Sequence, residues 1–208
     1  PSPITNCCFS ITMLPRVDLK KRDVDVKAWW RKIAPDSSHY STLLDTSSLL
    51  FVDGEPAGFY VTLPEDEVFQ IRQACQAIEY QSTYRTVGLR TCSRVIGFQP
   101  RLALRRDYCT SVALERESPE SHSALCAGAA LVAKYLQGYF PEQHAAQARI
   151  VQERVKPEWV LPGSHFTSGI VNWNSQLRYH FDAGNFPGTW NAMLTFKKDI
   201  DGGYLAIP

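Results

Sequence analysis

The chain has 208 residues, of which 44% are hydrophobic, and its 22 basic side chains nearly balance its 21 acidic ones. This composition excludes a disordered or fibrous chain, and the length allows one substantial core or two small ones. The near-neutral balance argues against a strongly basic protein that coats nucleic acid, although it leaves room for a local basic face. No apolar run reaches transmembrane length.

The first third of the sequence predicts two helices and a hairpin. Residues 24–33 favour a short helix, and residues 49–61 form two β-rich runs around Asp53-Gly54, a dipeptide typical of a tight hairpin turn. Pro64, followed by three acidic residues, predicts the start of a second helix. The apolar residues of that helix recur at helical spacing and are Val68, Ile71, Cys75 and Ile78.

The middle of the sequence is rich in arginine and then helical. Glycine and proline interrupt residues 85–110, which predicts loops and short strands. Its arginines form a candidate basic face, with an ordinary solvated surface as an alternative of equal weight. They are Arg85, Arg90, Arg94, Arg101, Arg105 and Arg106. One helix is predicted to open at Ser118-Pro119 and to end near Gly138, and another to run from Pro141 to about Val151.

After Pro157 the pattern changes to aromatic and β-branched residues between glycine and asparagine turns. Strands are predicted over 166–172, 177–182, 192–196 and 204–207. Helices first and strands last predict an α+β fold with helices packed against a sheet. We expect one domain over 1–208, with 1–157 mainly helical support and 158–208 the first strands of the sheet.

His180 and Asp182 form the strongest candidate site. Side chains two residues apart on a strand project from the same face, so both could bind one metal ion. They would supply two thirds of the two-His-one-carboxylate set that holds non-haem Fe(II). Alone the His-x-Asp pattern is weak, because a strand histidine bonded to a nearby aspartate is common. No histidine follows His180.

Other chemistries lack a convincing motif. The sequence has no Walker loop, no dinucleotide-binding fingerprint and no nucleophile elbow, and no Cys-x-x-Cys pair that would indicate structural zinc. Six cysteines without a secretion signal predict free thiols in an intracellular compartment. Cys109, near Arg105 and Arg106, is a candidate for a reactive thiol with a lowered pKa, although a buried structural thiol is the commoner arrangement.

Further runs surround the His-x-Asp pair. They are residues 166–172, His180-Phe181-Asp182-Ala183-Gly184-Asn185 and the Gly-Thr-Trp-x-Ala-Met run at 188–193, with looser likeness at 88–94, 97–101, 105–109 and 153–159. Together, over about 50–208, they resemble the catalytic core of the TET/JBP-type dioxygenases, in particular the small viral and microbial members. The resemblance implies helices packed on a double-stranded β-helix (jelly-roll) core that is incomplete in this chain. It also implies Fe(II) and 2-oxoglutarate as cofactors.

The same resemblance implies DNA as the partner and 5-methylcytosine as the substrate, with thymine as the alternative and the target base flipped out of the duplex. His180 and Asp182 would bind iron and act in catalysis. Asn185 would lie at the base pocket, where an amide can donate and accept, and a turn-forming role for it has equal weight. Ser168 and Asn172 would lie on the substrate side.

The arginines are assigned more loosely. Arg90 or Arg94 would bind a carboxylate of 2-oxoglutarate through a bidentate contact. Arg105 and Arg106 would face DNA phosphate, although they could equally pair with neighbouring carboxylates.

The family also uses a second iron-binding histidine and an arginine for 2-oxoglutarate, both after a turn like Gly202-Gly203. The sequence ends at Pro208 without them. We expect further residues to complete the set, because a barrel that stops after two or three strands leaves unpaired edges. A second polypeptide, an inactive relative that binds modified DNA, and a 2-oxoglutarate oxygenase with a non-DNA substrate are the alternatives.

Overall fold

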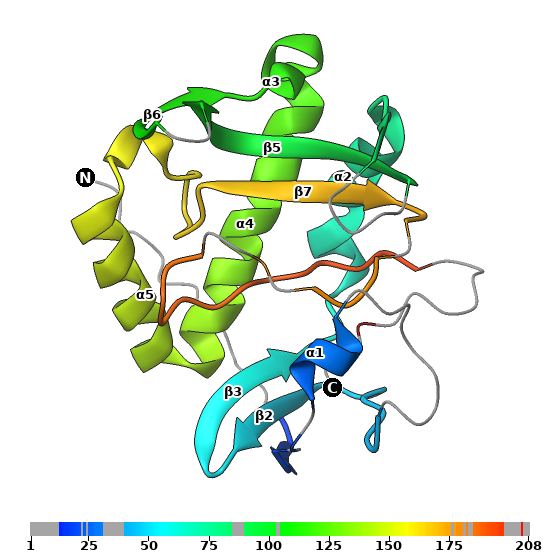
Figure 1. Cartoon of the computed structure of the whole chain (residues 1–208), viewed down its shortest axis with the longest axis vertical. Helices are drawn as coiled ribbons and strands as arrows, with labels where there is room; N and C mark the ends of the chain where they lie inside the picture. The colour runs from blue at the N-terminus through cyan, green and yellow to red at the C-terminus, as the bar shows by residue number, and fades with distance from the viewer. Residues whose placement is uncertain are drawn as a thin grey trace.

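The computed structural model describes residues 13–21, 23, 25–30, 40–84, 90–102, 105–175, 177–180, 182, 185–197 and 205, without the side chains of 26, 83, 84, 90, 100–102 and 105–108. Within these residues a layer of helices covers one face of a sheet, and a smaller sheet lies at the far end of the molecule (Figure 1). The chain is therefore an α+β protein, as the sequence predicts.

The smaller sheet contains the predicted hairpin. Strand β1 (Arg16–Leu19) runs parallel to β2 (Ser48–Val52), which pairs antiparallel with β3 (Glu55–Tyr60). At the turn, Asp53 has φ 52° and Gly54 has φ 83°. A two-residue turn of the mirror-image type needs positive φ at both positions, and Asp-Gly tolerates this, so the hairpin prediction is confirmed.

The larger sheet is built around one long strand. Its members are β4 (Gln81–Tyr84), β5 (Arg90–Leu102), β6 (Arg105–Ser111) and β7 (Ser168–Trp173). On β5, the first part pairs with β4, the last part with β6, and the middle with β7, all antiparallel. The prediction of loops and short strands over 85–110 was wrong for the described part, because Gly97 and Pro100 bend and shift the pairing of β5 without ending it.

Three of the described helices begin where proline and acidic residues predict. The described helices are α1 (Val26–Trp29), α2 (Glu65–Ala77), α3 (Ala113–Glu117), α4 (Pro119–Tyr139), α5 (Pro141–Arg154) and the short 3-10 helix η2 (Pro157–Trp159). Proline occupies the first position of α4 and of α5, where its missing N–H costs no hydrogen bond. The N–H of Phe140 closes α4 on the carbonyl of Leu136, and Pro141 starts the next helix.

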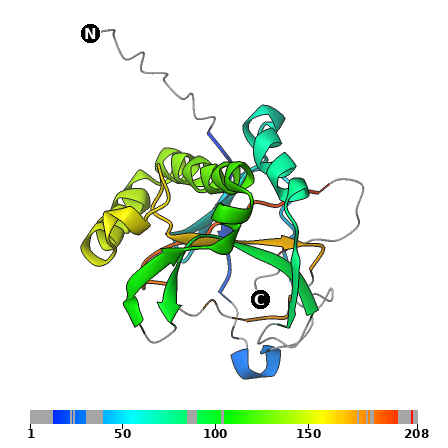
Figure 2. The ribbon, with the colours of Figure 1, turned by 90° about the horizontal axis from the view of Figure 1, so that it is seen from above.

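The core lies between the helices and the larger sheet. It contains Ile71 and Cys75 from α2, Leu125 from α4, Ile96 from β5 and Leu161 from the loop before β7. Helices α2 and α4 lie on the same side of β5 and β7 in the view from above (Figure 2). The other face of β7 is open, since Ile170 is 48% exposed.

The organisation of the chain differs from the predicted one. Six of the seven described strands precede residue 157, so the division into helices first and strands last was wrong. Residues 177–180 and 192–197 form no regular strand, and 204–207 lie almost entirely outside the described residues. The described strands form two open sheets, and a double-stranded β-helix is not formed within them.

Two further properties concern the described residues alone. No helix among them is long and apolar enough to cross a membrane. The described cysteines are free thiols, namely Cys75, Cys92, Cys109 and Cys126.

Candidate metal site

The structure brings His180 and Asp182 together. The Nε2 atom of His180 lies 3.4 Å from Oδ1 of Asp182. His180 is 31% exposed and Asp182 is more exposed, so the pair faces solvent. The two side chains meet even though their segment is not a regular strand, and the predicted pairing is therefore present without the predicted strand.

The backbone fixes how His180 presents its ring. Its Nδ1 atom lies 2.6 Å from the carbonyl oxygen of Arg178. A carbonyl can only accept, so Nδ1 carries the hydrogen, and in the neutral ring Nε2 turns a lone pair towards Asp182. With Nε2 unprotonated, two acceptors face each other, and either a proton or a metal cation between them relieves this arrangement. Histidine ligands of metals commonly donate their other N–H to a backbone carbonyl in this way.

The separation of the two atoms suits shared coordination. Metal bonds to histidine nitrogen and carboxylate oxygen are about 2.0–2.2 Å, which places two neighbouring ligand atoms about 3.0–3.5 Å apart. The observed 3.4 Å lies within this range without any movement of His180 or Asp182. Among the described residues, no group of three or more side chains that could hold a metal ion occurs, so His180 and Asp182 stand as two candidate ligands without a third.

Two asparagines contact Asp182 from its C-terminal side. Asn191 donates from Nδ2 to Oδ2 of the carboxylate at 3.2 Å, which leaves Oδ1 for His180. Asn185 points its Nδ2 at the backbone carbonyl of Asp182, at 3.5 Å. That contact fits the turn-forming role of Asn185, and its contact with a base stays a prediction.

Helix α1 supports the segment from its N-terminal side. The ring of Tyr179, next to His180, packs against Trp29 of α1 with the ring centroids 5.5 Å apart. The predicted helix at 24–33 thus contributes Trp29 to the surroundings of the site.

Ser168 and Asn172 lie on the open face of β7. Alternation along the strand groups them with Ile170 on the exposed face, while Gly169 contacts the buried Ile96. The two predicted substrate-side residues therefore share one uncovered face, with a hydroxyl, an amide and an apolar side chain.

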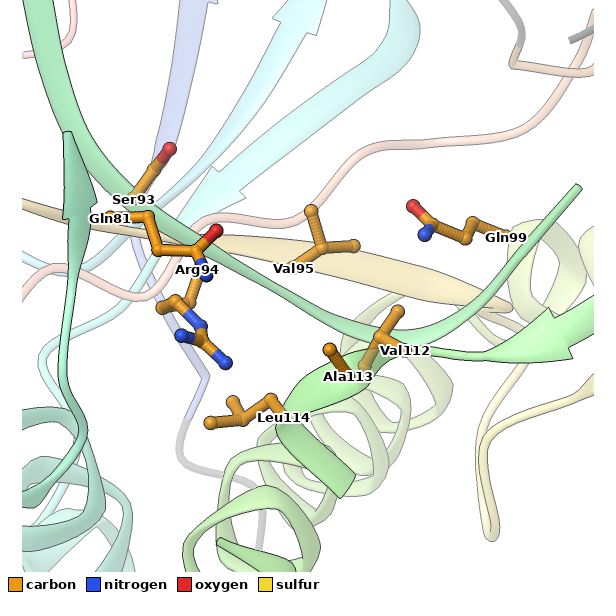
Figure 3. Close-up of a pocket in the computed structure, with 8 residues that line it drawn as sticks. All are labelled: Gln81, Ser93, Arg94, Val95, Gln99, Val112, Ala113 and Leu114. Atoms are coloured by element: carbon orange, nitrogen blue, oxygen red, sulfur yellow. The ribbon is translucent and has the colours of Figure 1, made fainter. Parts of the chain in front are cut away.

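Arg94 lies on the opposite face of the sheet from Ser168 and Asn172. It is 6% exposed, and it forms an ion pair with Glu117 at the end of α3. Figure 3 shows its guanidinium reaching from β5 towards Leu114, beside a cavity of about 240 Å³. The structure thus gives Arg94 a carboxylate partner from its own chain, Glu117. A contact between Arg94 and 2-oxoglutarate stays a prediction.

The remaining predicted residues are placed by backbone alone. Arg90 opens β5, and Arg105 and Arg106 open β6, but their side chains lie outside the described ones. The basic face therefore stays a prediction. Burial raises the pKa of the Cys109 thiol, which opposes the reactive role considered for it.

A histidine pair was not predicted from the sequence. His144 of α5 and His165, in the loop before β7, bring their Nε2 atoms to 3.0 Å. Burial lowers the pKa of both rings, and the neighbouring His144 lowers that of His165 further. The two residues are 21 positions apart in different elements, a spacing without any recognisable pattern.

This pair makes stability depend on pH. Its folded pKa values lie below the usual 6.5, so the unfolded chain binds more protons and stability falls as the pH drops below about 6.5. We expect the midpoint of thermal unfolding to fall between pH 7.5 and pH 5.5, and to fall less in a His144→Gln, His165→Gln double variant. The variant Gln143→Ala, in the same turn of α5, should keep the wild-type dependence. An unchanged dependence in the double variant would contradict the expectation.

No family model, curated protein or solved structure matches this chain.

Proposed function

We propose that the chain is an Fe(II)- and 2-oxoglutarate-dependent dioxygenase that oxidises the 5-methyl group of 5-methylcytosine in DNA to the hydroxymethyl group or beyond. The observation that carries the proposal is the His180–Asp182 pair, in which the hydrogen bond from Nδ1 to Arg178 leaves Nε2 facing the carboxylate at 3.4 Å. The sequence resemblance over 50–208 supports the rest.

The proposal includes a double-stranded β-helix as the complete core. The larger sheet would form one wall, with α2 and α4 outside it and the open face of β7 inside (Figure 2). The exposure of Ile170, Ser168 and Asn172 supports this assignment, because an inner wall that binds a ligand cannot be covered by helices.

Within this proposal, His180 Nε2 and Asp182 Oδ1 would hold the iron, and the negative carboxylate would offset part of its charge. Iron with 2-oxoglutarate, when bound there, would supply the activation of O2, with one oxygen atom going to the methyl group and the other to succinate, and with release of CO2. A base stacked in a duplex cannot reach such a site, so the target nucleotide is flipped out. Asn172 and Ser168 offer an amide and a hydroxyl to its polar edge.

The direct test is mass spectrometry of nucleosides. The protein is incubated with Fe(II), 2-oxoglutarate and DNA that carries 5-methylcytosine, with thymine oxidation measured in the same digest. We expect 5-hydroxymethylcytosine above the background of a His180→Ala variant. Consumption of 2-oxoglutarate without any oxidised 5-methylpyrimidine would overturn the assignment of DNA as the substrate. A chain that binds modified DNA but does not bind iron would overturn the assignment as an enzyme.

Salt dependence tests the predicted basic face separately. If Arg105 and Arg106 contact phosphate, replacing both by alanine should reduce the slope of log affinity against log salt by roughly 2. The matched control replaces Arg149 and Arg154 of α5, both exposed, and should leave the slope unchanged after the same loss of charge. Equal slopes in the two double variants would remove Arg105 and Arg106 from the DNA interface.

The predicted contact of Asn185 with the target base should affect turnover more than DNA affinity. Asn185→Ala should reduce turnover by a larger factor than it weakens DNA binding, because the pocket acts on one base and the arginines on the backbone. Nucleoside yield and equilibrium binding of the same DNA measure the two effects. A larger loss of binding than of turnover would contradict the pocket role.

A further inference from the structure

The carboxylate of Asp182 has its two oxygen atoms divided between two neighbours. Oδ2 accepts the hydrogen bond from Asn191 at 3.2 Å, and Oδ1 faces His180 at 3.4 Å. Asp182 is largely exposed on an irregular segment, where a free carboxylate would rotate about its side-chain bonds. The amide of Asn191 therefore selects one orientation, with Oδ1 presented to the metal position.

A buried glutamine holds the backbone next to Asn191. Gln147 of α5 is 1% exposed, and its Oε1 accepts the N–H of Trp190 at 2.9 Å while its Nε2 lies 3.5 Å from the carbonyl of the same residue. One side-chain amide thus makes the two hydrogen bonds that an adjacent strand would make. The backbone at Trp190 is fixed to a helix even though it belongs to no sheet.

Two more contacts fasten the same segment. Gln143, one turn before Gln147 on α5, donates from Nε2 to the carbonyl of Gly188 at 3.0 Å. The ring of Trp190 meets Phe140 edge-on, with the ring centroids 5.3 Å apart. The residues before Asn191 are therefore attached to the rigid junction of α4 and α5.

We propose that Asn191 is a positioning residue of the metal site and that Gln147 holds it in place through the backbone of Trp190. The inference rests on the proposed function in that His180 and Asp182 bind a metal ion. With Oδ2 engaged, Asp182 binds through Oδ1 alone, and the positions that a bidentate carboxylate would occupy stay open for other ligands. Hydrogen-bonded partners of metal ligands typically change metal affinity about 10- to 100-fold when they are removed.

The test is a titration with Mn²⁺ as a redox-stable substitute for Fe(II), read from the electron paramagnetic resonance signal of the free ion. Asn191→Leu keeps the approximate size of the side chain and removes the donor. We expect its Mn²⁺ dissociation constant to rise about 10- to 100-fold, with the unfolding midpoint of the metal-free protein close to that of wild type. Gln147→Leu should weaken Mn²⁺ binding and lower that midpoint, because the partly buried N–H and carbonyl of Trp190 lose their partner.

The matched control is Thr189→Val. Thr189 donates from Oγ1 to the carbonyl of Phe186 within the same segment and makes no contact with the Asp182 carboxylate among those described. Removing the Thr189 hydroxyl should leave the Mn²⁺ dissociation constant unchanged. Wild-type affinity in Asn191→Leu would overturn the positioning role alone, while absence of Mn²⁺ binding by the wild-type chain would overturn the metal site and the proposed function with it.

Discussion

Replacing His180 by alanine should abolish metal binding and turnover while leaving the metal-free protein folded. In the proposed site, His180 is one of two candidate ligands among the described residues, and its side chain is partly exposed, with described contacts to Arg178 and Asp182. Its removal therefore costs a ligand and very little packing. We expect Mn²⁺ binding at least about 100-fold weaker, since a direct ligand exceeds the effect of its hydrogen-bonded partners.

His144→Ala is the informative control for that experiment. It also removes a histidine, but from the pair with His165, which joins α5 to the loop before β7. We expect it to lower the unfolding midpoint and to keep wild-type Mn²⁺ affinity. If His180→Ala binds Mn²⁺ as wild type does, or if His144→Ala loses the ion, the metal belongs elsewhere.

Replacing Gly97 by alanine should lower the free energy of unfolding by about 2–4 kcal/mol, the sum of a disfavoured backbone conformation and a steric clash. Gly97 has φ 81°, and a Cβ atom there would lie 2.5 Å from the carbonyl oxygen of Thr167 and 3.0 Å from Cα of Ser168. Both are backbone atoms of the segment that pairs with β5, so neither can move without opening the sheet.

Gly54→Ala separates the two contributions. Gly54 has φ 83°, nearly the same as Gly97, but a Cβ atom there would meet nothing within 4 Å. The free energy of unfolding of Gly54→Ala should therefore fall only by the conformational cost of about 1 kcal/mol. Denaturant unfolding of both variants measures the difference, and equal losses would show that Thr167 and Ser168 yield to the new methyl group.

The extent to which the sequence predicts this fold depends on how local the cause is. Asp53-Gly54 and the prolines at 119 and 141 act on their own backbone, and the hairpin and both helix starts are where they predict. At Gly97 the sequence predicts an interruption, which is wrong because the role of this glycine is not local. The carbonyl of Thr167, distant in sequence, occupies the space that a side chain would need.

The candidate site divides in the same way. Two-residue spacing on a predicted strand placed His180 and Asp182 side by side, and the structure has them 3.4 Å apart although no regular strand forms there. The roles of Asn191 and Gln147 could not be predicted. A single glutamine on a helix has no sequence signature, and the residue that Gln147 holds, Trp190, lies 43 positions away. The ion pair of Arg94 with Glu117 escaped prediction for the same reason: it depends on α3 returning to β5.

The pairing of β5 with β7 also constrains the order in which the molecule can form. These strands are separated in sequence by β6 and by the whole of α3, α4 and α5, so closing them together costs loop entropy that local contacts must first offset. The helical hairpin of α4 and α5 consists of near neighbours and can assemble early. We therefore expect strand β7 to dock on β5 late, and the open face with Ser168 and Asn172 to form only when it does.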